Sequence, residues 1–371
     1  MRIVHTEASN GWGGQEIRIL NETQGMIARG HELFLLCAPH SRIYEEARKR
    51  GLHAEALPIG RKSLRGLCAM RRWLKNNPVD VVNTHSSTDS WLTALACTLL
   101  PNPPAIVRTR HISAPVNNSL GTRWLYTRAT RHIVTTGEKL REQLINDNGY
   151  PATQITSVPT GIDTQRFSPG DKIAARAQLG LDPSHHYIGI VATLRSWKGH
   201  LHLLEAFAQL HAPDWRLLIV GDGPMRDVIK QRIVDLGLNE RVQMAGQQEN
   251  VETWLQALDI FCLPSYANEG VPQALLQAML TALPIVTTPV GSITEAVTDA
   301  HSALIVPPRQ PGQLASALRT LIDDPALATR LGVAAQDVAA NNFGLITMLS
   351  KMESIFARAS QEHPASTMQG R

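Results

Sequence analysis

The sequence is poor in cysteine and has no cysteine and histidine pattern suited to a metal ion. Its 371 residues include four cysteines, none of which forms a CxxC pair or a Cys/His cluster with metal-ligand spacing. Scattered single thiols are typical of a reducing compartment. We therefore expect no disulfide and no bound metal. The cysteines are Cys37, Cys68, Cys97 and Cys262.

Long apolar runs are also missing. The longest uncharged ones cover residues 91–100 and 274–286, and Gln277 and Pro284 interrupt the second. A helix that spans a membrane needs about 20 consecutive apolar residues, so no such helix is predicted. Near the start, Glu7 precedes any apolar stretch of signal-peptide length. We therefore expect a cytoplasmic protein.

The overall composition is that of an ordinary globular protein. Apolar residues make up 43% and charged residues 18%, which excludes a disordered or fibrous chain. The length predicts about two domains. Residues 1–165 contain 20 basic and 13 acidic side chains, a net charge of +7, whereas the remainder has 16 and 19, a net charge of −3. The first half is therefore the basic half.

Short β-branched apolar runs alternate with stretches long enough for a helix, which indicates repeated β-α-β units. The runs are almost continuously apolar, as buried parallel strands are. The first series covers 3–7, 32–38, 80–86, 105–111 and 132–138. The second covers 187–193, 215–223, 241–246, 259–265, 283–290 and 303–308.

The two series predict an α/β fold with two doubly wound, Rossmann-like domains. A Pro/Gly/Asp-rich stretch at 160–171 separates them. Ligands of such domains bind at the carboxyl ends of the strands, so we expect a site in the cleft between the two domains. The expected division is 1–165 and 166–345, a helix at 346–360 that packs back on the first domain, and a frayed tail at 361–371.

The stretch 264–297 carries the strongest functional signal. A strand ends in a polar loop with Glu269, and Gly270 and Pro272 then lead into a helix that is expected to continue to Thr281, with Pro272 at an early helical position. The amides at a helix start and the helix dipole favour a phosphate group. Glu269 beside them is suited to accept hydrogen bonds from sugar hydroxyls.

These residues resemble the retaining glycosyltransferases of family four, also called group 1, which have the GT-B fold. That family has an E-x7-E pattern whose first Glu contacts the donor sugar and whose second holds the nucleotide ribose. The matching positions are Glu269 and Gln277, so the second departs from the pattern. The resemblance assigns donor contacts to the start of this helix, at Gly270, Val271, Pro272, Gln273 and Gln277.

The resemblance continues at 190–200. The family has an Arg and a Lys there that neutralise the donor diphosphate, and the matching positions are Thr193 and Lys198. Arg195 lies two residues beyond Thr193 and is a candidate for the missing cation. A leaving diphosphate gains negative charge, which fixed cations stabilise, so Lys198 is a predicted catalytic residue. Glu269, expected to orient the donor sugar, is a second one. With cations in this role, no metal or other cofactor is expected.

In the first half, residues 10–16 resemble the family's GGxE loop, which faces the donor phosphate and the acceptor. Gly14 is assigned to the donor and Gly13 to the acceptor side. His111 follows a strand where the family has a His near the donor sugar, and we assign it a catalytic role. His85 ends another strand and is a weaker candidate for the acceptor side. Neither GxGxxG nor a hydrolase triad is present.

The resemblance covers most of residues 1–345 and implies transfer of a sugar, with retention, from a UDP-, GDP- or ADP-linked donor to an acceptor hydroxyl. A saccharide or lipid-linked saccharide in bacterial cell-surface polysaccharide or lipopolysaccharide assembly is the expected acceptor. The basic stretch 61–77, with Leu64, Leu67, Cys68 and Leu74 on one helical face, suits either anionic lipid at the inner membrane face or an ordinary surface helix. No nucleic-acid partner is expected.

Three other functions fit the sequence as well. A sugar phosphorylase and a nucleotide-sugar epimerase use a related two-domain fold with phosphate or water in place of an acceptor. A binding protein without catalytic activity is suggested by Thr193 and Gln277, which depart from the family pattern. The donor base, the sugar, the acceptor and the oligomeric state stay open.

Overall fold

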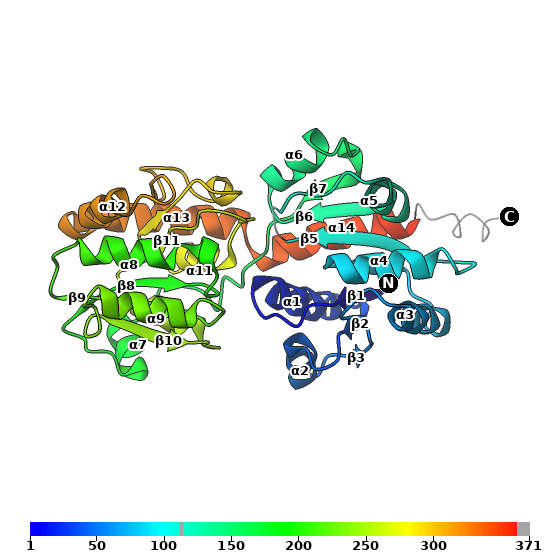
Figure 1. The fold of residues 1–371 in the computed structure, drawn as a ribbon, viewed down its shortest axis with the longest axis horizontal. Coiled ribbons are helices and arrows are strands. Elements are labelled where there is room, and N and C mark those ends of the chain that lie inside the picture. The colour runs from blue at the N-terminus through cyan, green and yellow to red at the C-terminus, as the bar shows by residue number, and fades with distance from the viewer. Residues whose placement is uncertain (112–113, 362–371) are drawn as a thin grey trace. The chain divides into compact units, whose positions relative to one another are not determined.

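The structure is a computed structural model that describes residues 1–111 and 114–361. It divides into two compact α/β units (Figure 1). Unit 1 comprises Met1–Gly161 and Ile346–Arg371, and unit 2 comprises Ile162–Leu345. The division after Gly161 falls shortly before the expected boundary at 165/166. Of the tail expected at 361–371, only Gln361 lies among the described residues.

Unit 1 is built on a seven-stranded parallel sheet with the order β3-β2-β1-β4-β5-β6-β7. The strands are β1 (Arg2–Glu7), β2 (Glu32–Cys37), β3 (Ala54–Ala56), β4 (Val81–Thr84), β5 (Ala105–Arg110), β6 (His132–Thr135) and β7 (Ile155–Ser157). The connecting helices are α1 (Gly14–Ala28), α2 (Arg42–Lys49), α3 (Leu64–Asn76), α4 (Ser87–Cys97), α5 (Leu120–Trp124) and α6 (Glu138–Asn146).

Alternate residues of the central strands enter different cores. In β2, Phe34 and Leu36 join an apolar cluster on one face of the sheet, whereas Leu35 and Cys37 join a second cluster with Ile19 of α1. Successive strand residues point to opposite faces, so a strand covered by helices on both sides must be apolar throughout. The continuous apolar runs of the sequence have this physical origin.

Unit 2 repeats the design with a six-stranded parallel sheet in the order β10-β9-β8-β11-β12-β13. Its strands are β8 (His186–Val191), β9 (Trp215–Val220), β10 (Val242–Gly246), β11 (Ile260–Leu263), β12 (Ile285–Thr287) and β13 (Leu304–Ile305). The helices are α7 (Lys172–Leu179), α8 (His200–Ala208), α9 (Arg226–Asp235), α10 (Val251–Ala257), α11 (Gln273–Leu280), α12 (Pro311–Asp323) and α13 (Pro325–Asn342).

In each sheet the strand order reverses at one place. The reversal falls between β1 and β4 in unit 1 and between β8 and β11 in unit 2. At such a point the loops that follow the two strands diverge to opposite faces and leave a crevice at the carboxyl edge, which is where open α/β sheets bind ligands. The predicted site residues follow these strands or a direct neighbour.

The last helix, α14 (Leu345–Gln361), packs against α1 of unit 1 (Figure 1). Glu353 accepts a hydrogen bond from Arg29 Nη1 at 2.7 Å and lies 2.8 Å from Nε2 of His31. A Cβ atom added to Gly25 would overlap the side chain of Leu349. The glycine therefore lets the two helices approach closely.

Two sequence expectations need correction. The sheet of unit 1 contains the short strands β3 and β7, which the apolar pattern does not reveal because each has only three residues. The expected apolar face of α3 is correct only in part, because Leu74 is buried and Leu67 packs against the apolar core, whereas Leu64 and Cys68 are exposed. Gly66, Met70, Trp73 and Leu74 are its buried residues, whereas Leu64 is 80% exposed. No helix among the described residues combines the length and hydropathy needed to cross a membrane.

Candidate active site

The structure brings the two predicted catalytic residues of unit 2 into direct contact. Lys198 ends a 3₁₀ turn (Ser196–Lys198) after β8, and Glu269 lies in the loop after the neighbouring strand β11. Lys198 Nζ and Glu269 Oε1 are 2.6 Å apart, and Ser265 Oγ donates a hydrogen bond to the same oxygen at 2.6 Å. Glu269 is only 4% exposed. A buried carboxylate with a cation and a hydroxyl on one oxygen is held in a single orientation.

Two glycines fix the loops that carry this pair. Gly199, with φ +79°, allows the turn after Lys198 to touch the backbone of Pro264, and Gly291, with φ +58°, touches the carbonyl of Glu269. A Cβ atom at either position would overlap that backbone. Both residues combine a left-handed φ with close packing, a combination that only glycine accepts without strain.

The loop after Glu269 leads directly into α11. Gly270, Val271 and Pro272 are buried, and the helix begins at Gln273. Pro272 is the extended residue just before the helix, with φ −69° and ψ 131°, so its expected place inside the first turn is wrong. The first turn of α11, whose free amides and dipole favour an anion, thus begins four residues after Glu269.

Two other predicted donor contacts of unit 2 are more exposed to solvent than Glu269. Arg195 is exposed, and its guanidinium stacks 5.8 Å from the ring of Trp197. Its amide donates to the carbonyl of Thr193 at 2.7 Å, which places both candidate replacements for the family Arg in one loop. Gln277 is partly exposed on α11. Within the described part of the chain its side-chain amide has no hydrogen-bond partner.

In unit 1 the glycine loop connects β1 to α1. Gly13 is the extended residue before α1, and Gly14 is the first residue of the helix. Glu16 of the GGxE-like stretch is buried, which raises its pKa. The loop is held by Glu7 at the end of β1, whose carboxyl accepts hydrogen bonds from the amide of Ser9 at 2.7 Å and from the side chain of Gln15.

The two predicted histidines of unit 1 are also neighbours. His85 follows β4 and His111 follows β5, and His85 Nδ1 lies 2.9 Å from His111 Nε2. The other ring nitrogen of His85, Nε2, lies 2.9 Å from Nδ1 of His5 on β1. His85 is only 5% exposed, whereas His111 is partly exposed. Both ring nitrogens of His85 are therefore occupied within the protein.

Comparison with known proteins identifies the family of the chain. Residues 171–338 match the family model described as glycosyl transferases group 1, and residues 12–166 match glycosyltransferase family 4. A D-inositol 3-phosphate glycosyltransferase of Nocardia farcinica is 30% identical over 309 residues, which cover 77% of this chain and 68% of the relative. The chain belongs to the group 1 glycosyltransferases.

Other relatives are glycosyltransferases named for other glycans. The lipopolysaccharide core mannosyltransferase LpsB of Rhizobium meliloti is 34% identical over 184 residues, covering 47% of this chain and 52% of LpsB. An Escherichia coli galactosyltransferase named for a diphosphoundecaprenol acceptor is 24% identical over 310 residues, covering 80% and 79%.

Solved structures establish the GT-B fold of this glycosyltransferase. Anabaena HepE, solved in complex with UDP-glucose, has a TM-score of 0.87 at 20% identity and covers 96% of this chain and all of its own. A glycosyltransferase of Rickettsia africae has a TM-score of 0.86 at 19% identity, with 97% and 99% coverage. The GT-B assignment made from the sequence motifs is confirmed.

The structure also shows residues beside the predicted site residues that the sequence motifs did not reveal. In unit 2, the amide of Tyr266 donates to the carbonyl of Trp197 at 2.8 Å and so connects the loops after β11 and β8, and the Arg309 guanidinium stacks 4.3 Å from the ring of Tyr266. In unit 1, Asp89 is buried and accepts a hydrogen bond from Thr6 Oγ1 at 2.7 Å. No local spacing marks these residues, because each meets its partner from a distant element.

Buried acids dominate the electrostatics of the glycine-loop edge. Burial, with the nearby charge of Asp89 as a second cause, raises the pKa of Glu7 to about 8. Burial also raises the pKa of Asp89. Among the described residues, no group of three His, Cys, Asp or Glu side chains is placed to hold a metal ion.

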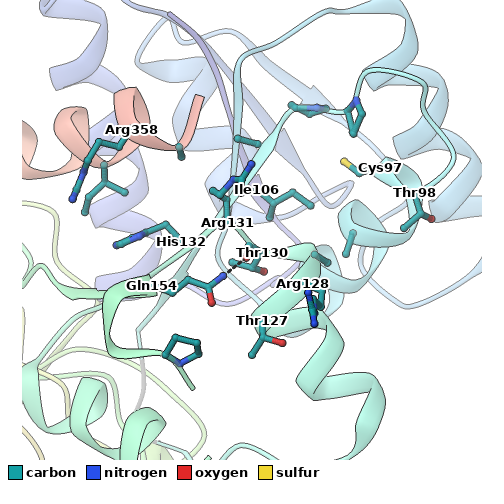
Figure 2. Close-up of a pocket in the computed structure, with 18 of the residues that line it drawn as sticks. Cys97, Thr98, Ile106, Thr127, Arg128, Thr130, Arg131, His132, Gln154 and Arg358 are labelled. Carbon is teal, nitrogen blue, oxygen red and sulfur yellow. Dashed lines mark hydrogen bonds between the residues drawn. The ribbon is translucent and has the colours of Figure 1, made fainter. Parts of the chain in front are cut away.

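Unit 1 also has a cavity of about 730 Å³ near the start of β5 and β6 (Figure 2). Its lining includes Ala105 and Ile106 of β5, His132 of β6, and the basic side chains of Arg131 and Arg358. The strands run parallel, so this is the opposite edge of the sheet from His85 and His111. The cavity is therefore separate from the predicted site residues.

Proposed function

We propose that this glycosyltransferase moves a sugar from a nucleoside diphosphate donor to an acceptor hydroxyl with retention at the anomeric carbon. The observation that carries the proposal is the Lys198–Glu269 pair at the strand-order reversal of unit 2, beside the start of α11. A cation and helix amides suit a diphosphate, and a carboxylate suits sugar hydroxyls. No other paired charge in unit 2 combines these elements among the described residues.

In the proposed reaction, Lys198 neutralises the diphosphate as it leaves, because negative charge grows on it when the glycosidic bond breaks. Glu269 orients the donor sugar through its hydroxyls. In the free protein these two side chains satisfy each other, so donor binding replaces one ion pair by two separate contacts. Arg195, exposed in the same loop, supplies a second cation, and the diphosphate then requires no metal ion or other cofactor.

Other residues near the predicted site are assigned to the remaining parts of the donor and to the acceptor. Gln277, which lies one turn into α11, holds the ribose through its side-chain amide, which both donates and accepts hydrogen bonds. His111 contacts the donor sugar, and Gly13 and Gly14 allow the phosphates and the acceptor to approach the backbone closely.

We further propose that the acceptor belongs to bacterial cell-surface glycan assembly and is a saccharide or a lipid-linked saccharide. The names of the Rhizobium and Escherichia relatives support this class. Peripheral contact with an anionic membrane fits the same proposal. On α3, Leu64 is 80% exposed, and Arg65, Arg71 and Arg72 of the same helix are also exposed. Exposed apolar and basic side chains on one helix are typical of helices that rest on anionic lipid.

The experiment begins with a thermal-shift screen of UDP, GDP and ADP, because a ligand of the folded state raises the apparent melting temperature. The sugar form of the strongest nucleotide is then incubated with saccharide and lipid-linked acceptors, and NMR reports the anomeric configuration of the product. A product that keeps the configuration of the donor supports the proposal. An inverted product, or stabilisation by none of the three nucleotides, contradicts it.

A further inference from the structure

Three histidines form a hydrogen-bonded line through the centre of unit 1. His5 lies on β1, His85 follows β4 and His111 follows β5, and these three strands are neighbours in the sheet. The distances from His5 Nδ1 to His85 Nε2 and from His85 Nδ1 to His111 Nε2 are both 2.9 Å. His5 is fully buried, so the line runs from the core to the partly exposed His111.

The inner end of the line meets a buried ion pair. His5 Nε2 lies 3.8 Å from Glu22 Oε1, and Glu22 Oε2 lies 3.6 Å from Arg18 Nε. Asn83 Nδ2 donates to Glu22 Oε1 at 3.4 Å. Arg18 and Glu22 are fully buried on successive turns of α1.

The charge state of this pair follows from the chemistry of arginine. A guanidinium stays protonated in proteins, and a fully buried cation needs a counter-charge nearby. Glu22 is the carboxylate beside it. Burial is the largest influence on Glu22 and raises its pKa, while the charge and hydrogen bonding of Arg18 act in the opposite direction. We assign the negative charge that faces His5 to Glu22, because its carboxyl group forms the ion pair with Arg18.

A carboxylate facing His5 Nε2 selects one protonation pattern along the whole line. The N–H dipole of a neutral ring points its positive end towards an anion, so the proton of His5 sits on Nε2 and its Nδ1 accepts. His85 must then donate from Nε2 and accept at Nδ1. His111 in turn donates from Nε2, which leaves its Nδ1 unprotonated.

This pattern, in which every Nδ1 is unprotonated, requires three neutral rings, because a doubly protonated imidazole has no acceptor nitrogen. Burial lowers the pKa of His5 to about 3 and lowers the pKa values of His85 and His111 well below their usual value. Nδ1 of His111 has no hydrogen-bond partner within the described part of the chain, and the residue is partly exposed.

We propose that His5 and His85 are positioning residues, set by Glu22, that hold His111 in its Nε2–H form and present Nδ1 to the substrate as a hydrogen-bond acceptor. The proposal rests on the role of His111 given under the proposed function. It also assigns His85 a positioning role in place of the contact with the acceptor substrate that the sequence analysis expects. His111 thereby accepts from a sugar hydroxyl and does not donate to it.

The first test measures the tautomers in the free protein. Long-range ¹H–¹⁵N correlation spectra of histidine-labelled protein at neutral pH distinguish the protonated from the unprotonated ring nitrogen, and His→Gln variants assign the signals. The proposal expects the Nε2–H form at all three rings. An Nδ1–H form at His111 overturns it, and this result does not depend on whether the protein transfers sugar.

The second test separates hydrogen bonding from space filling. His85→Phe keeps a ring but no nitrogen, whereas His85→Gln keeps one donor and one acceptor. We expect kcat to fall about tenfold in the Phe variant, roughly the value of one hydrogen bond, with donor KM nearly unchanged, and to recover largely in the Gln variant. His132→Phe, at the opposite edge of the sheet, is the matched control. Equal kcat in the Phe and Gln variants would contradict the proposal.

Discussion

At the scale of single residues, Glu269 and Lys198 share one short contact but have separate roles in the proposed reaction. Glu269→Gln keeps the shape and the hydrogen bond from Ser265 but removes the charge. We expect kcat to fall about 100-fold, because the amide orients sugar hydroxyls less strongly than a carboxylate. The Kd of the free nucleoside diphosphate, measured by calorimetry, should change less than about threefold.

The matched control for this variant is Glu252→Gln, which breaks an exposed ion pair with Arg166 elsewhere in unit 2. Exposed pairs contribute about 0–1 kcal/mol, so this variant should keep normal kcat. Loss of free-nucleotide binding in Glu269→Gln would assign the residue to the nucleotide or to loop structure.

Gln277 offers a gain-of-affinity prediction. A carboxylate forms stronger hydrogen bonds with ribose hydroxyls than an amide does, by about 1 kcal/mol. Gln277→Glu should therefore tighten nucleotide binding by roughly threefold to tenfold. A 2′,3′-dideoxy analogue is the control, since it lacks the hydroxyls concerned. Equal tightening with the analogue would show that residue 277 does not contact the ribose.

The raised pKa of Glu7 predicts that the stability of the protein depends on pH. Its pKa is about 8 in the folded protein, above its ordinary value of 4.5. Between pH 4.5 and pH 8 the folded state therefore keeps a proton on Glu7 that the unfolded state has released. Stability relative to a neutral variant is then lost as pH rises from about 4.5 to 8. Glu7→Gln should match the wild type near pH 4 and exceed it by a few kcal/mol above pH 8. Parallel urea unfolding curves at the two pH values test this, and a constant difference contradicts it.

At the scale of elements, the motif residues were predictable from the sequence and their surroundings were not. Lys198, Glu269 and the start of α11 follow apolar runs that are visible in the sequence, and parallel strands place such residues at one edge of a sheet. His5, Asp89 and Arg309 sit in or beside ordinary elements, and only the fold gives them partners. The buried face of α3 differs in part from the expected one, because Gly66, Met70 and Trp73 lie on it.

The contact between α1 and α14 depends on one glycine. Gly25→Val should place methyl groups where Leu349 now lies and destabilise the protein by about 1–3 kcal/mol. Leu349→Ala alone removes buried apolar surface and should cost about 2–5 kcal/mol. In the double variant the valine fills part of that space, so the two costs should not add. Additive losses in thermal unfolding would show that the helices separate at this point.

The exposed part of α3 supports a test of membrane contact. Leu64 is 80% exposed, so Leu64→Glu should leave the melting temperature within about 1 °C of the wild type. Sedimentation with vesicles that contain anionic lipid should fall several-fold, because the substitution removes apolar area and adds repulsion. Ile346→Glu, at a similarly exposed residue near the start of α14, is the control. Equal sedimentation of the two variants contradicts a role of α3.

At the scale of the whole molecule, each unit presents its predicted residues at the same kind of place. The strand order reverses between β1 and β4 and between β8 and β11. His85 and the Lys198–Glu269 pair follow strands at these reversals, and His111 follows β5, the neighbour of β4. The topology, which the alternating pattern predicts, therefore determines where the predicted site residues lie. The family resemblance indicates which reaction these residues serve.

The central claim is that Lys198 stabilises the leaving diphosphate. The most direct measurement is the rate of sugar transfer by Lys198→Met at saturating donor, compared with Lys172→Met, which breaks a surface ion pair with Asp259 in the same unit. Circular dichroism verifies that both variants fold. We predict that kcat falls about 100-fold or more for Lys198→Met and stays near the wild-type value for Lys172→Met. Near-normal turnover of folded Lys198→Met would contradict the account.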